Sequence, residues 1–368
     1  MSKKSLYLKY RPKNLDDLVG QNNFVSTIRQ ASKYKKFAHS YLLCGTKGCG
    51  KTSSARIIAN LLNCVDVKDG KVCGDCPACN KIPTGASMDV VELDGAKQRK
   101  VEDINNLLES ATWSPQELKK KVFTIDEAHQ LSSTAISSLL KIVEEPPEYL
   151  TFIFCTTEPD KIPDTILSRS QRHVFHKISS KEIAARLRYI CTEEGILSDD
   201  ESLYSIAKMG RGSMRDAIGY LEQIDTVVGE EEITEDLVYK YFGIADRKGV
   251  YDLIYSMLKS DFSMVMEQCN DMIVGSVDIR GLLYEISEVF RGILMIKTQG
   301  EKTRLVDLPD HEIQKIVKLS KGINLSQLNA LSKEFSTIEK ELKYSINKRL
   351  VLESTLVRCT ARFLQKNK

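Results

Sequence analysis

The sequence predicts an α/β fold in its first half and an all-helical fold in the rest. Short apolar runs at 40–44, 121–125 and 151–155 have the length and composition of buried parallel strands, and segments with helical spacing follow them. Eight of the nine prolines precede residue 164, and from residue 246 onward the apolar pattern is helical throughout. A chain of 368 residues is also too long for one core, so we expect two or three domains.

The composition, 42% hydrophobic and 28% charged residues, is that of an ordinary globular protein. A net charge of +3 does not by itself indicate a nucleic-acid-binding protein, although a local basic face stays open. The first twelve residues lack the apolar stretch of a secretion signal, and no later run is long enough to span a bilayer. We therefore expect a cytoplasmic, reducing compartment, where the ten cysteines are ligands or buried apolar residues rather than disulfides.

A glycine-rich loop separates the first predicted strand from a predicted helix: Gly45-Thr46-Lys47-Gly48-Cys49-Gly50-Lys51-Thr52. It matches the phosphate-loop pattern G-x-x-x-x-G-K-[ST] at every required position. A strand, a glycine loop and a helix in this order direct backbone N–H groups and a helix N-terminus at phosphates. We predict a nucleotide-binding loop in which Lys51 reaches the β- and γ-phosphates and Thr52 holds Mg²⁺. The alternative is a glycine turn that binds nothing.

Four cysteines follow this helix, with the spacing C-x8-C-x2-C-x2-C, at Cys64, Cys73, Cys76 and Cys79. Thiolates two residues apart on a tight turn can bind one tetrahedral ion, and four of them complete a closed zinc site. Such a site has no open position for a substrate, so we predict a structural zinc ion. An iron–sulfur cluster is the first alternative, but the ferredoxin spacing needs a cysteine where this chain has Pro83. Four unliganded thiols are the second alternative.

Two later predicted strands end in polar side chains. Asp126 and Glu127 end the strand that begins at Lys121, and they suit Mg²⁺ binding and polarisation of an attacking water. Thr157 ends the strand after that, where parallel sheets bind ligands. By itself a strand that ends in two acidic residues is weak evidence, but downstream of a phosphate loop it indicates a hydrolytic site.

Basic side chains recur at predicted helix ends. Arg169 and Arg172 follow a short predicted helix, where they could pair with local carboxylates or reach a neighbouring subunit's phosphate site. Arg215 falls in the first turn of a helix that Ser213 caps, where a cation is unfavourable, so an anion outside the helix is its expected partner. Lys100 belongs to a basic cluster that opens a helix and suits either phosphate contact or a solvated helix start.

Together these segments resemble the AAA+ ATPase family and, within it, the gamma/tau clamp-loader family of bacterial DNA polymerase III. The resemblance covers about residues 5–240 by specific motifs and the helical remainder by order and length. It implies a phosphate-loop AAA+ module with an inserted zinc-binding motif over 1–179, a small helical lid over 180–242 and an all-helical oligomerisation collar over 243–368. In the family's serine–arginine–cysteine motif, Ser170 stands in the place of the usual cysteine, but the arginine before it is kept.

The resemblance also implies roles for particular residues. The nucleotide would be bound by residues near the adenine and along the phosphates: Arg11, Pro12, Val19, Gly45, Thr46, Lys47, Gly48, Cys49, Gly50, Lys51, Thr52 and Ser53. The catalytic set would be Lys51, Asp126, Glu127, Thr157 as first sensor, Arg215 on the γ-phosphate and Arg169 as an arginine finger acting in trans. Gln98 and Arg99 differ from the usual residues before Lys100, which makes Lys100 only a tentative DNA contact.

The implied function is that of an ATP-hydrolysing motor subunit of the DNA polymerase III holoenzyme. With ATP, Mg²⁺ and Zn²⁺ as cofactors, the chain would assemble with further copies of itself and with delta and delta-prime type subunits, open the sliding clamp and load it onto primed DNA. No membrane partner is expected. The chain ends at Lys368, whereas longer family members continue into a segment that binds the polymerase and helicase, so we expect a short form or a shortened chain.

Three other functions are compatible with parts of this pattern. A structural subunit that has lost the ATPase would keep the fold and the cysteines, but it would not need the phosphate loop, the acidic pair and Arg215 together. A different AAA+ motor, acting on Holliday junctions or at replication origins, is disfavoured by the cysteine insertion and the helical tail. A phosphate-loop kinase for a small substrate would need neither an arginine finger nor a collar.

Overall fold

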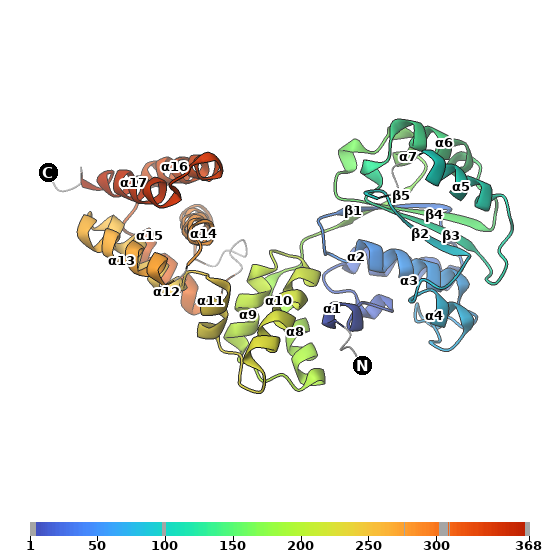
Figure 1. Ribbon diagram of the computed structural model, residues 1–368, viewed down its shortest axis with the longest axis horizontal. Coiled ribbons are helices and arrows are strands. Elements are labelled where there is room, and N and C mark those ends of the chain that lie inside the picture. Colours follow the sequence, from blue (N-terminus) through green and yellow to red (C-terminus); the bar gives the residue numbers. More distant parts are fainter. Residues whose placement is uncertain (1–4, 98–100, 276, 302–307, 309, 365–368) are drawn as a thin grey trace. The chain divides into compact units, whose positions relative to one another are not determined.

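The computed structural model describes residues 5–97, 101–275, 277–301, 308 and 310–364. The chain forms two compact units, Met1–Gly195 with Ile206–Thr226, and Ile196–Ser205 with Val227–Lys368. Figure 1 labels the helices and strands of the chain. Each unit has hydrophobic clusters of its own. The division runs through one helix, α9 (Asp200–Met209).

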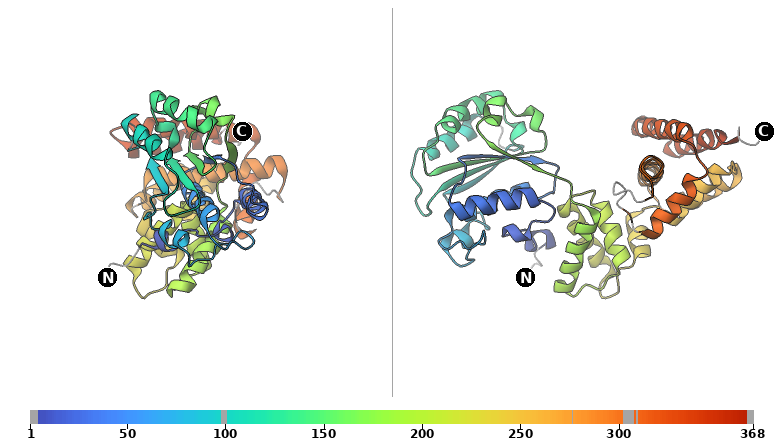
Figure 2. Two further views of the ribbon diagram at one scale, coloured as in Figure 1. Left: turned by 90° about the vertical axis from the view of Figure 1, so that its right-hand side faces the viewer. Right: turned by 180° about the vertical axis from the view of Figure 1, so that it is seen from behind.

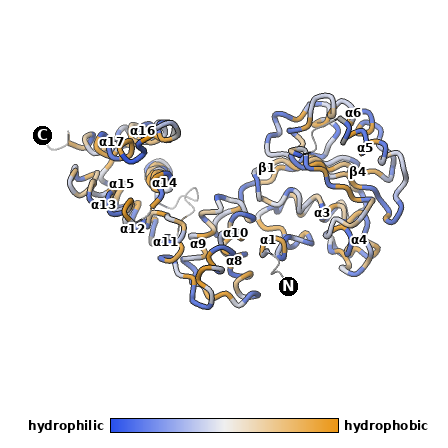
Figure 3. The backbone as a smooth tube through the Cα atoms, viewed as in Figure 1, coloured by the Kyte–Doolittle hydropathy of each residue, from blue (hydrophilic) through white to orange (hydrophobic). Residues whose placement is uncertain are grey.

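The first unit is built on a parallel sheet of five strands. In spatial order the strands are β2 (Val90–Asp94), β3 (Lys121–Asp126), β4 (Leu150–Thr156), β1 (Ser40–Gly45) and β5 (Gln171–Phe175). The central strands β1, β3 and β4 are buried almost throughout, which is why they read as continuous apolar runs. Figure 3 shows β1 and β4 as hydrophobic stretches of the tube.

Because successive side chains of a strand point to opposite faces, each face of the sheet carries its own core. Tyr41 and Leu43 face α2 (Asn22–Tyr34) and α3 (Lys51–Asn63). Their neighbours in β1 belong to the other cluster, with buried side chains of α5 (Val101–Ala111), α6 (Ser133–Glu144) and α7 (Asp164–Leu167). In the right-hand view of Figure 2 the helices coloured blue lie on one side of the sheet and those coloured green on the other. The predicted α/β class is confirmed.

The sequence reasoning missed strand β5, and its placement of Arg172 at a helix end was wrong. Arg172 lies inside β5, where it pairs in register with Leu42 of β1. The strand lies at the edge of the sheet and its pattern is mostly exposed, with only Phe175 fully buried. An edge strand has one partner and needs no continuous apolar run, so periodicity gave no signal for it.

Short helices complete the first unit. They are α1 (Leu6–Lys9), η1 (Leu15–Asp17), α4 (Pro77–Lys81), η2 (Ala128–Gln130) and η3 (Pro159–Lys161). Two longer helices follow the sheet: α8 (Ser180–Glu194), with a capping box between Ser179 and Glu182, and α10 (Met214–Val228).

The second unit contains seven further helices in its described part: α11 (Glu235–Phe242), α12 (Arg247–Leu258), α13 (Phe262–Val274), α14 (Ile279–Gln299), α15 (Asp310–Ser320), α16 (Leu325–Tyr344) and α17 (Lys348–Ala361). The helical apolar pattern that begins at residue 246 includes one stripe on α14 and one on α16, and these two stripes are buried against each other. Phe290 and Phe335 meet with ring centroids 5.3 Å apart. The stripes therefore form the core of this unit. No helix in the described part of the chain is long and apolar enough to cross a bilayer.

Candidate active site

The phosphate loop leaves β1 at Gly45 and enters α3 at Lys51. Gly48 and Gly50 have φ values of +75° and +105°, a region that side chains strain to occupy. A Cβ on Gly48 would lie 1.9 Å from Oγ of Ser213, so a larger residue cannot fit without displacing that segment. Gly50 is the N-cap of α3 and has no side chain, so no capping side chain of this residue competes with an anion for the first N–H groups.

The Lys51 amine lies along the loop. The residue is 6% exposed, and Nζ donates hydrogen bonds to the carbonyl oxygens of Gly45 at 2.8 Å and Thr46 at 2.9 Å. The thiol of Cys49 donates to the Thr46 carbonyl as well, at 2.8 Å. The loop is therefore tied together by its own side chains, with a buried positive charge at its centre.

Two oxygen-bearing side chains, a hydroxyl and a carboxylate, lie next to each other beside the phosphate loop. The Thr52 hydroxyl, in the first turn of α3, donates to Oδ2 of Asp126 at the end of β3, at 2.7 Å. A hydroxyl and a carboxylate at this separation suit a divalent cation such as Mg²⁺, which prefers oxygen ligands. The arrangement fits the predicted magnesium site.

The second carboxylate, Glu127, is held from the end of β4. Thr157 donates its hydroxyl hydrogen bond to Oε2 of Glu127 at 3.1 Å. Glu127 itself has φ +49°, which for a residue other than glycine is a strained backbone conformation of the kind found at functional sites. The strand ends thus bring Asp126, Glu127 and Thr157 to one edge of the sheet.

One cavity of the first unit collects most of the predicted nucleotide site. Its lining includes Lys47 through Ser53, Arg11, Pro12, Val19, Asp126, Glu127 and Arg215. Its apolar wall is formed by Tyr7, Leu18, Ile178, Met214 and Ile218. An apolar wall at one part of the cavity and a phosphate loop at another match the two chemical halves of a nucleotide.

Positive charge dominates the cavity. Arg11, Lys47, Lys51, Arg186 and Arg215 line it, against the carboxylates of Asp17, Asp126 and Glu127. Burial lowers the pKa of the Arg11 guanidinium, and the neighbouring charge of Arg56 lowers it further. Arg11 also donates through Nε to the hydroxyl of Ser53, at 3.2 Å. This cluster of positively charged side chains favours a ligand that carries several negative charges.

Arg215 reaches the cavity from the start of α10. The backbone N–H of Met214 donates to the carbonyl of Gly48 at 3.1 Å, so the first turn of α10 is joined directly to the phosphate loop. Ser213 caps that turn by accepting from the N–H of Asp216 at 3.2 Å. An arginine in the first turn of this helix therefore lies against an anion site, as the helix-dipole argument predicts.

Arg169 lies away from this cavity. Its side chain is 39% exposed, and Nη2 forms an ion pair with Oε1 of Glu144 at 2.8 Å. Nη1 donates to the carbonyl of Thr165 and to the hydroxyl of Ser168, both at 3.2 Å. Arg169 is not among the residues that line the nucleotide cavity of the first unit. Lys100, the tentative DNA contact, lies outside the described residues.

The sequence reasoning missed the cavity residues Tyr7, Asp17, Leu18, Arg186, Met214, Ile178 and Ile218. Most of them are ordinary apolar residues on short or distant elements, which no motif distinguishes. Arg186 lies in the middle of α8, about 130 positions from the phosphate loop, and only the packing of α8 onto the first unit brings it to the cavity. No local signal could have found it.

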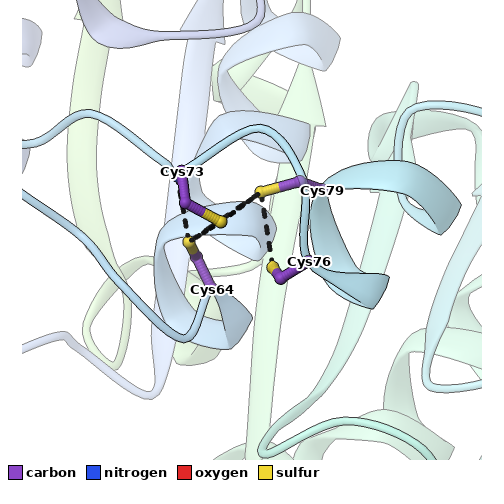
Figure 4. A group of neighbouring side chains, drawn as sticks. All are labelled: Cys64, Cys73, Cys76 and Cys79. Atoms are coloured by element: carbon purple, nitrogen blue, oxygen red, sulfur yellow. Dashed lines mark hydrogen bonds between the residues drawn. The ribbon is translucent and has the colours of Figure 1, made fainter.

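The four cysteines converge in the first unit, between the end of α3 and the start of α4 (Figure 4). Neighbouring sulfurs are 3.5–3.9 Å apart, and all four lie within 4.8 Å of one another. Thiolates on a tetrahedral zinc ion, with Zn–S bonds of about 2.3 Å, are about 3.8 Å apart. The backbone N–H of Cys73 also donates to Sγ of Cys64, at 3.3 Å. The donor set fits zinc and leaves no position for substrate.

A phosphate loop and an acidic strand end, followed in the chain by a helical module, define a nucleotide-binding protein of the AAA+ ATPase class. Three family models match the chain in succession: the delta subunit of DNA polymerase III over residues 20–179, the ATPase lid domain of the DNA polymerase III clamp loader subunit over 182–231, and domain III of subunits gamma and tau over 233–367. The chain belongs to the gamma/tau family of DNA polymerase III subunits.

Curated relatives agree. The DNA polymerase III subunit gamma of Buchnera aphidicola is 32% identical over 365 residues, which cover 97% of this chain and 99% of that protein. The tau/gamma subunit of Haemophilus influenzae is 33% identical over 98% of this chain and 52% of its own length, and Escherichia coli tau is 31% identical over 98% and 56%. The chain spans about half the length of these two longer relatives.

Proposed function

We propose that this chain is an ATPase motor subunit of a clamp loader, which uses ATP binding and hydrolysis to open a sliding clamp and place it on primed DNA. The observation that carries the proposal is the joining of the phosphate loop to the acidic strand end, through Thr52 and Asp126 at 2.7 Å, with Glu127 and Arg215 lining the same cavity. Membership of the gamma/tau family supplies the biological context.

In this proposal each residue of the cavity has one task. The N–H groups at the start of α3 and the amine of Lys51 bind the β- and γ-phosphates, and Lys51 exchanges its bonds to Gly45 and Thr46 for bonds to phosphate oxygens. Mg²⁺ held by Thr52 and Asp126 would neutralise charge on the phosphate oxygens. The apolar wall with Pro12 and Val19 receives the base.

Hydrolysis then depends on Glu127. Its carboxylate accepts a proton from the attacking water, whose oxygen forms a bond to the γ-phosphorus while the bond to the bridging oxygen of ADP breaks. Thr157 orients the carboxylate through its 3.1 Å hydrogen bond. Arg215 stabilises the negative charge from the same subunit. Arg169 leaves Glu144 and acts on the nucleotide of a neighbouring subunit, a contribution typically worth about 10³–10⁵ in rate.

The remaining segments take supporting roles. We propose residues 1–179 as the nucleotide-binding module, 180–242 as the lid and 243–368 as the oligomerising collar. The cysteine cluster would hold a structural Zn²⁺. The partners would be further copies of this chain, delta and delta-prime type subunits, the sliding clamp and primed DNA, with Lys100 as a tentative phosphate contact. Because the relatives are DNA polymerase subunits, we assign the complex to the cytoplasm.

The test is steady-state ATP hydrolysis by the complex reconstituted with delta and delta-prime type partners, with and without the sliding clamp and primed DNA. We expect clamp and primed DNA together to stimulate hydrolysis strongly. Lys51→Ala is expected to lose nucleotide binding, whereas Arg169→Ala is expected to bind nucleotide normally and lose the stimulated rate. The matched control is Arg172→Ala, an exposed arginine on β5 that does not belong to the proposed catalytic set.

Two outcomes would contradict the proposal. If the rate of ATP hydrolysis does not change when clamp and DNA are added, the chain is a nucleotide-binding protein and not a clamp-loading motor. A rate that responds to them but is unchanged in Arg169→Ala would keep the motor and remove the trans arginine finger.

A further inference from the structure

His129 occupies an unusual position beside the acidic pair. It lies in η2, two residues after Glu127, and its side chain is only 6% exposed. The imidazole reaches the end of β4, where it contacts Thr156, which is completely buried, and Glu158. A buried histidine surrounded by polar groups of a hydrolytic site is a candidate for a role in that site.

One placement of the proton on this imidazole satisfies its hydrogen-bond partners. The Thr156 hydroxyl accepts from the backbone N–H of Glu158 at 3.0 Å, and it can donate its own proton to Nδ1 of His129, which lies 3.0 Å away. Nε2 faces a carboxylate oxygen of Glu158 at 3.2 Å and has to carry the proton that bonds to it. An imidazole that carries a proton on Nε2 and accepts at Nδ1 satisfies these contacts.

The position of this proton constrains Glu127. Oε2 of Glu127 lies 3.5 Å from Nδ1, beyond a normal hydrogen bond. Since Nδ1 is already an acceptor for Thr156, the carboxylate gains nothing by turning toward it. The same Oε2 accepts from Thr157 at 3.1 Å, and Glu127 lines the nucleotide cavity. The imidazole thus disfavours the orientation in which the Glu127 carboxylate turns toward Nδ1. Thr157 stabilises the orientation in which the carboxylate accepts its hydrogen bond.

We propose that His129 is a positioning residue for Glu127: buried behind the carboxylate and fixed by Thr156 and Glu158, it keeps Glu127 bonded to Thr157 and directed at the cavity. This inference rests on the proposed ATP hydrolysis, in which Glu127 takes the proton of the attacking water. His129 does not line the cavity, so it contributes to the chemical step and not to nucleotide binding.

The experiment uses the reconstituted complex and separates the rate from the affinity. His129→Leu keeps a side chain of related size but removes both nitrogens, and we expect kcat to fall by about 10- to 100-fold, the range that misplacement of a catalytic group produces. The dissociation constant for a fluorescent ATP analogue should stay within about twofold. His129→Asn offers an amide oxygen in place of Nδ1, so it should recover most of kcat, whereas His129→Gln should not.

A double-mutant cycle tests whether His129 acts through Glu127. Glu127→Gln removes the proton acceptor, so adding His129→Leu to Glu127→Gln should cause no further loss of rate. His39→Leu is the matched control, since His39 is exposed on the loop before β1 and outside the site. Thermal unfolding of each variant checks that the fold is intact.

Three results would overturn the inference. The first is a kcat for His129→Leu within twofold of the wild-type value, and the second is an equal loss of rate from His129→Leu with or without Glu127. The third does not need ATPase activity: ¹⁵N NMR of the histidine-labelled full chain should find the His129 proton on Nε2, and a proton on Nδ1 would exclude the proposed network. If wild type and Glu127→Gln hydrolyse ATP equally, the proposed function fails, and the NMR result still decides the position of the proton.

Discussion

The Thr52 hydroxyl and the Asp126 carboxylate, 74 positions apart in the chain, are joined by a hydrogen bond of 2.7 Å. The bond connects the first turn of α3 to the carboxyl end of β3, beside the phosphate loop. Parallel strands that all end at one edge of a sheet bring such groups together, which is why sites of this class form there. Breaking this contact, and others like it in both units, should have measurable effects.

The first prediction concerns magnesium. Thr52→Ala removes one of the two oxygens and should abolish the enhancement of ATP affinity by Mg²⁺, while affinity in EDTA stays within a few-fold of the wild-type value. Thr52→Ser keeps the hydroxyl and should retain most of the enhancement. Titration of a fluorescent nucleotide at several Mg²⁺ concentrations measures both. Equal magnesium enhancement in Thr52→Ala and wild type would show that the hydroxyl is not a ligand.

The second prediction concerns the backbone of the phosphate loop. Gly48→Ala combines a strained φ of +75° with a Cβ that would lie 1.9 Å from Oγ of Ser213. Gly85→Ala is the matched control, because Gly85 has φ +70° and a Cβ added there would meet no atom of the described residues within 4 Å. We expect the control to lose about 1 kcal/mol of stability from backbone strain alone and to bind ATP normally. Gly48→Ala should weaken ATP binding at least tenfold.

Nucleotide titrations and urea unfolding of the two glycine variants decide this point. If Gly48→Ala and Gly85→Ala behave alike, contact between the loop and Ser213 does not restrict the loop.

The third prediction concerns the cysteine cluster. The purified chain should contain about one zinc ion per molecule, and Cys79→Ser should lose it, because four thiolates are needed to close the site. Removal of zinc by a strong chelator should lower the unfolding temperature of the wild-type chain. The matched control is Cys191→Ala, a buried cysteine of α8 outside the cluster, which should keep its zinc.

Metal analysis and differential scanning calorimetry measure this prediction. Iron in the purified chain would favour the iron–sulfur alternative, and a chain that holds no metal, with an unchanged unfolding temperature under chelation, would leave four free thiols.

The fourth prediction concerns a buried ion cluster in the second unit. Arg247 is 8% exposed and forms ion pairs with Glu285, at 3.3 Å, and with Glu312. Arg247→Met leaves both carboxylates buried without their cation, which should cost about 3–5 kcal/mol of unfolding free energy. Adding Glu285→Gln and Glu312→Gln to Arg247→Met should recover a large part of the loss, because uncharged amides replace the charges.

Chemical denaturation followed by circular dichroism measures these variants. If the two glutamate substitutions lower the unfolding free energy further when they are added to Arg247→Met, the two glutamates stabilise the unit independently of Arg247.

The fifth prediction concerns pH. Asp89 is 1% exposed and accepts backbone hydrogen bonds from Gln116, Glu117 and Leu118 at 2.7–3.1 Å. Burial by itself raises the pKa of Asp89, but these N–H groups outweigh it, so its pKa lies below the usual value. A carboxyl group with a depressed pKa stabilises the fold above its unfolded pKa of about 3.9, and this contribution is lost as the pH falls toward the folded pKa.

Asp89→Asn should therefore lower the unfolding free energy by about 1–3 kcal/mol at pH 7, and the difference from wild type should shrink below about pH 4. Urea unfolding between pH 3 and 7 measures it, with Asp160→Asn, an exposed aspartate, as the control. A difference that does not change with pH would assign the effect to packing rather than to the charge.

Several features were predictable because they depend on neighbours in the sequence. The order of glycines and the lysine in the phosphate loop, and the spacing of the cysteines, constrain the local backbone so closely that their geometry could be expected. The stripes on α14 and α16 were predictable because helical periodicity is itself a local property. The edge strand β5 was missed for the converse reason, since only its pairing with β1 defines it.

The class of fold, the phosphate loop, the acidic strand end and the spacing of the four cysteines were all predictable, since short stretches of consecutive residues specify each of them. Four other features depend on the tertiary fold: Ser213 lies against Gly48, Arg186 reaches the cavity, Arg169 pairs with Glu144, and His129 contacts Thr156 and Glu158. The physical reason is that side-chain environments come from the packing of segments far apart in the chain, and no local pattern specifies which of them will meet.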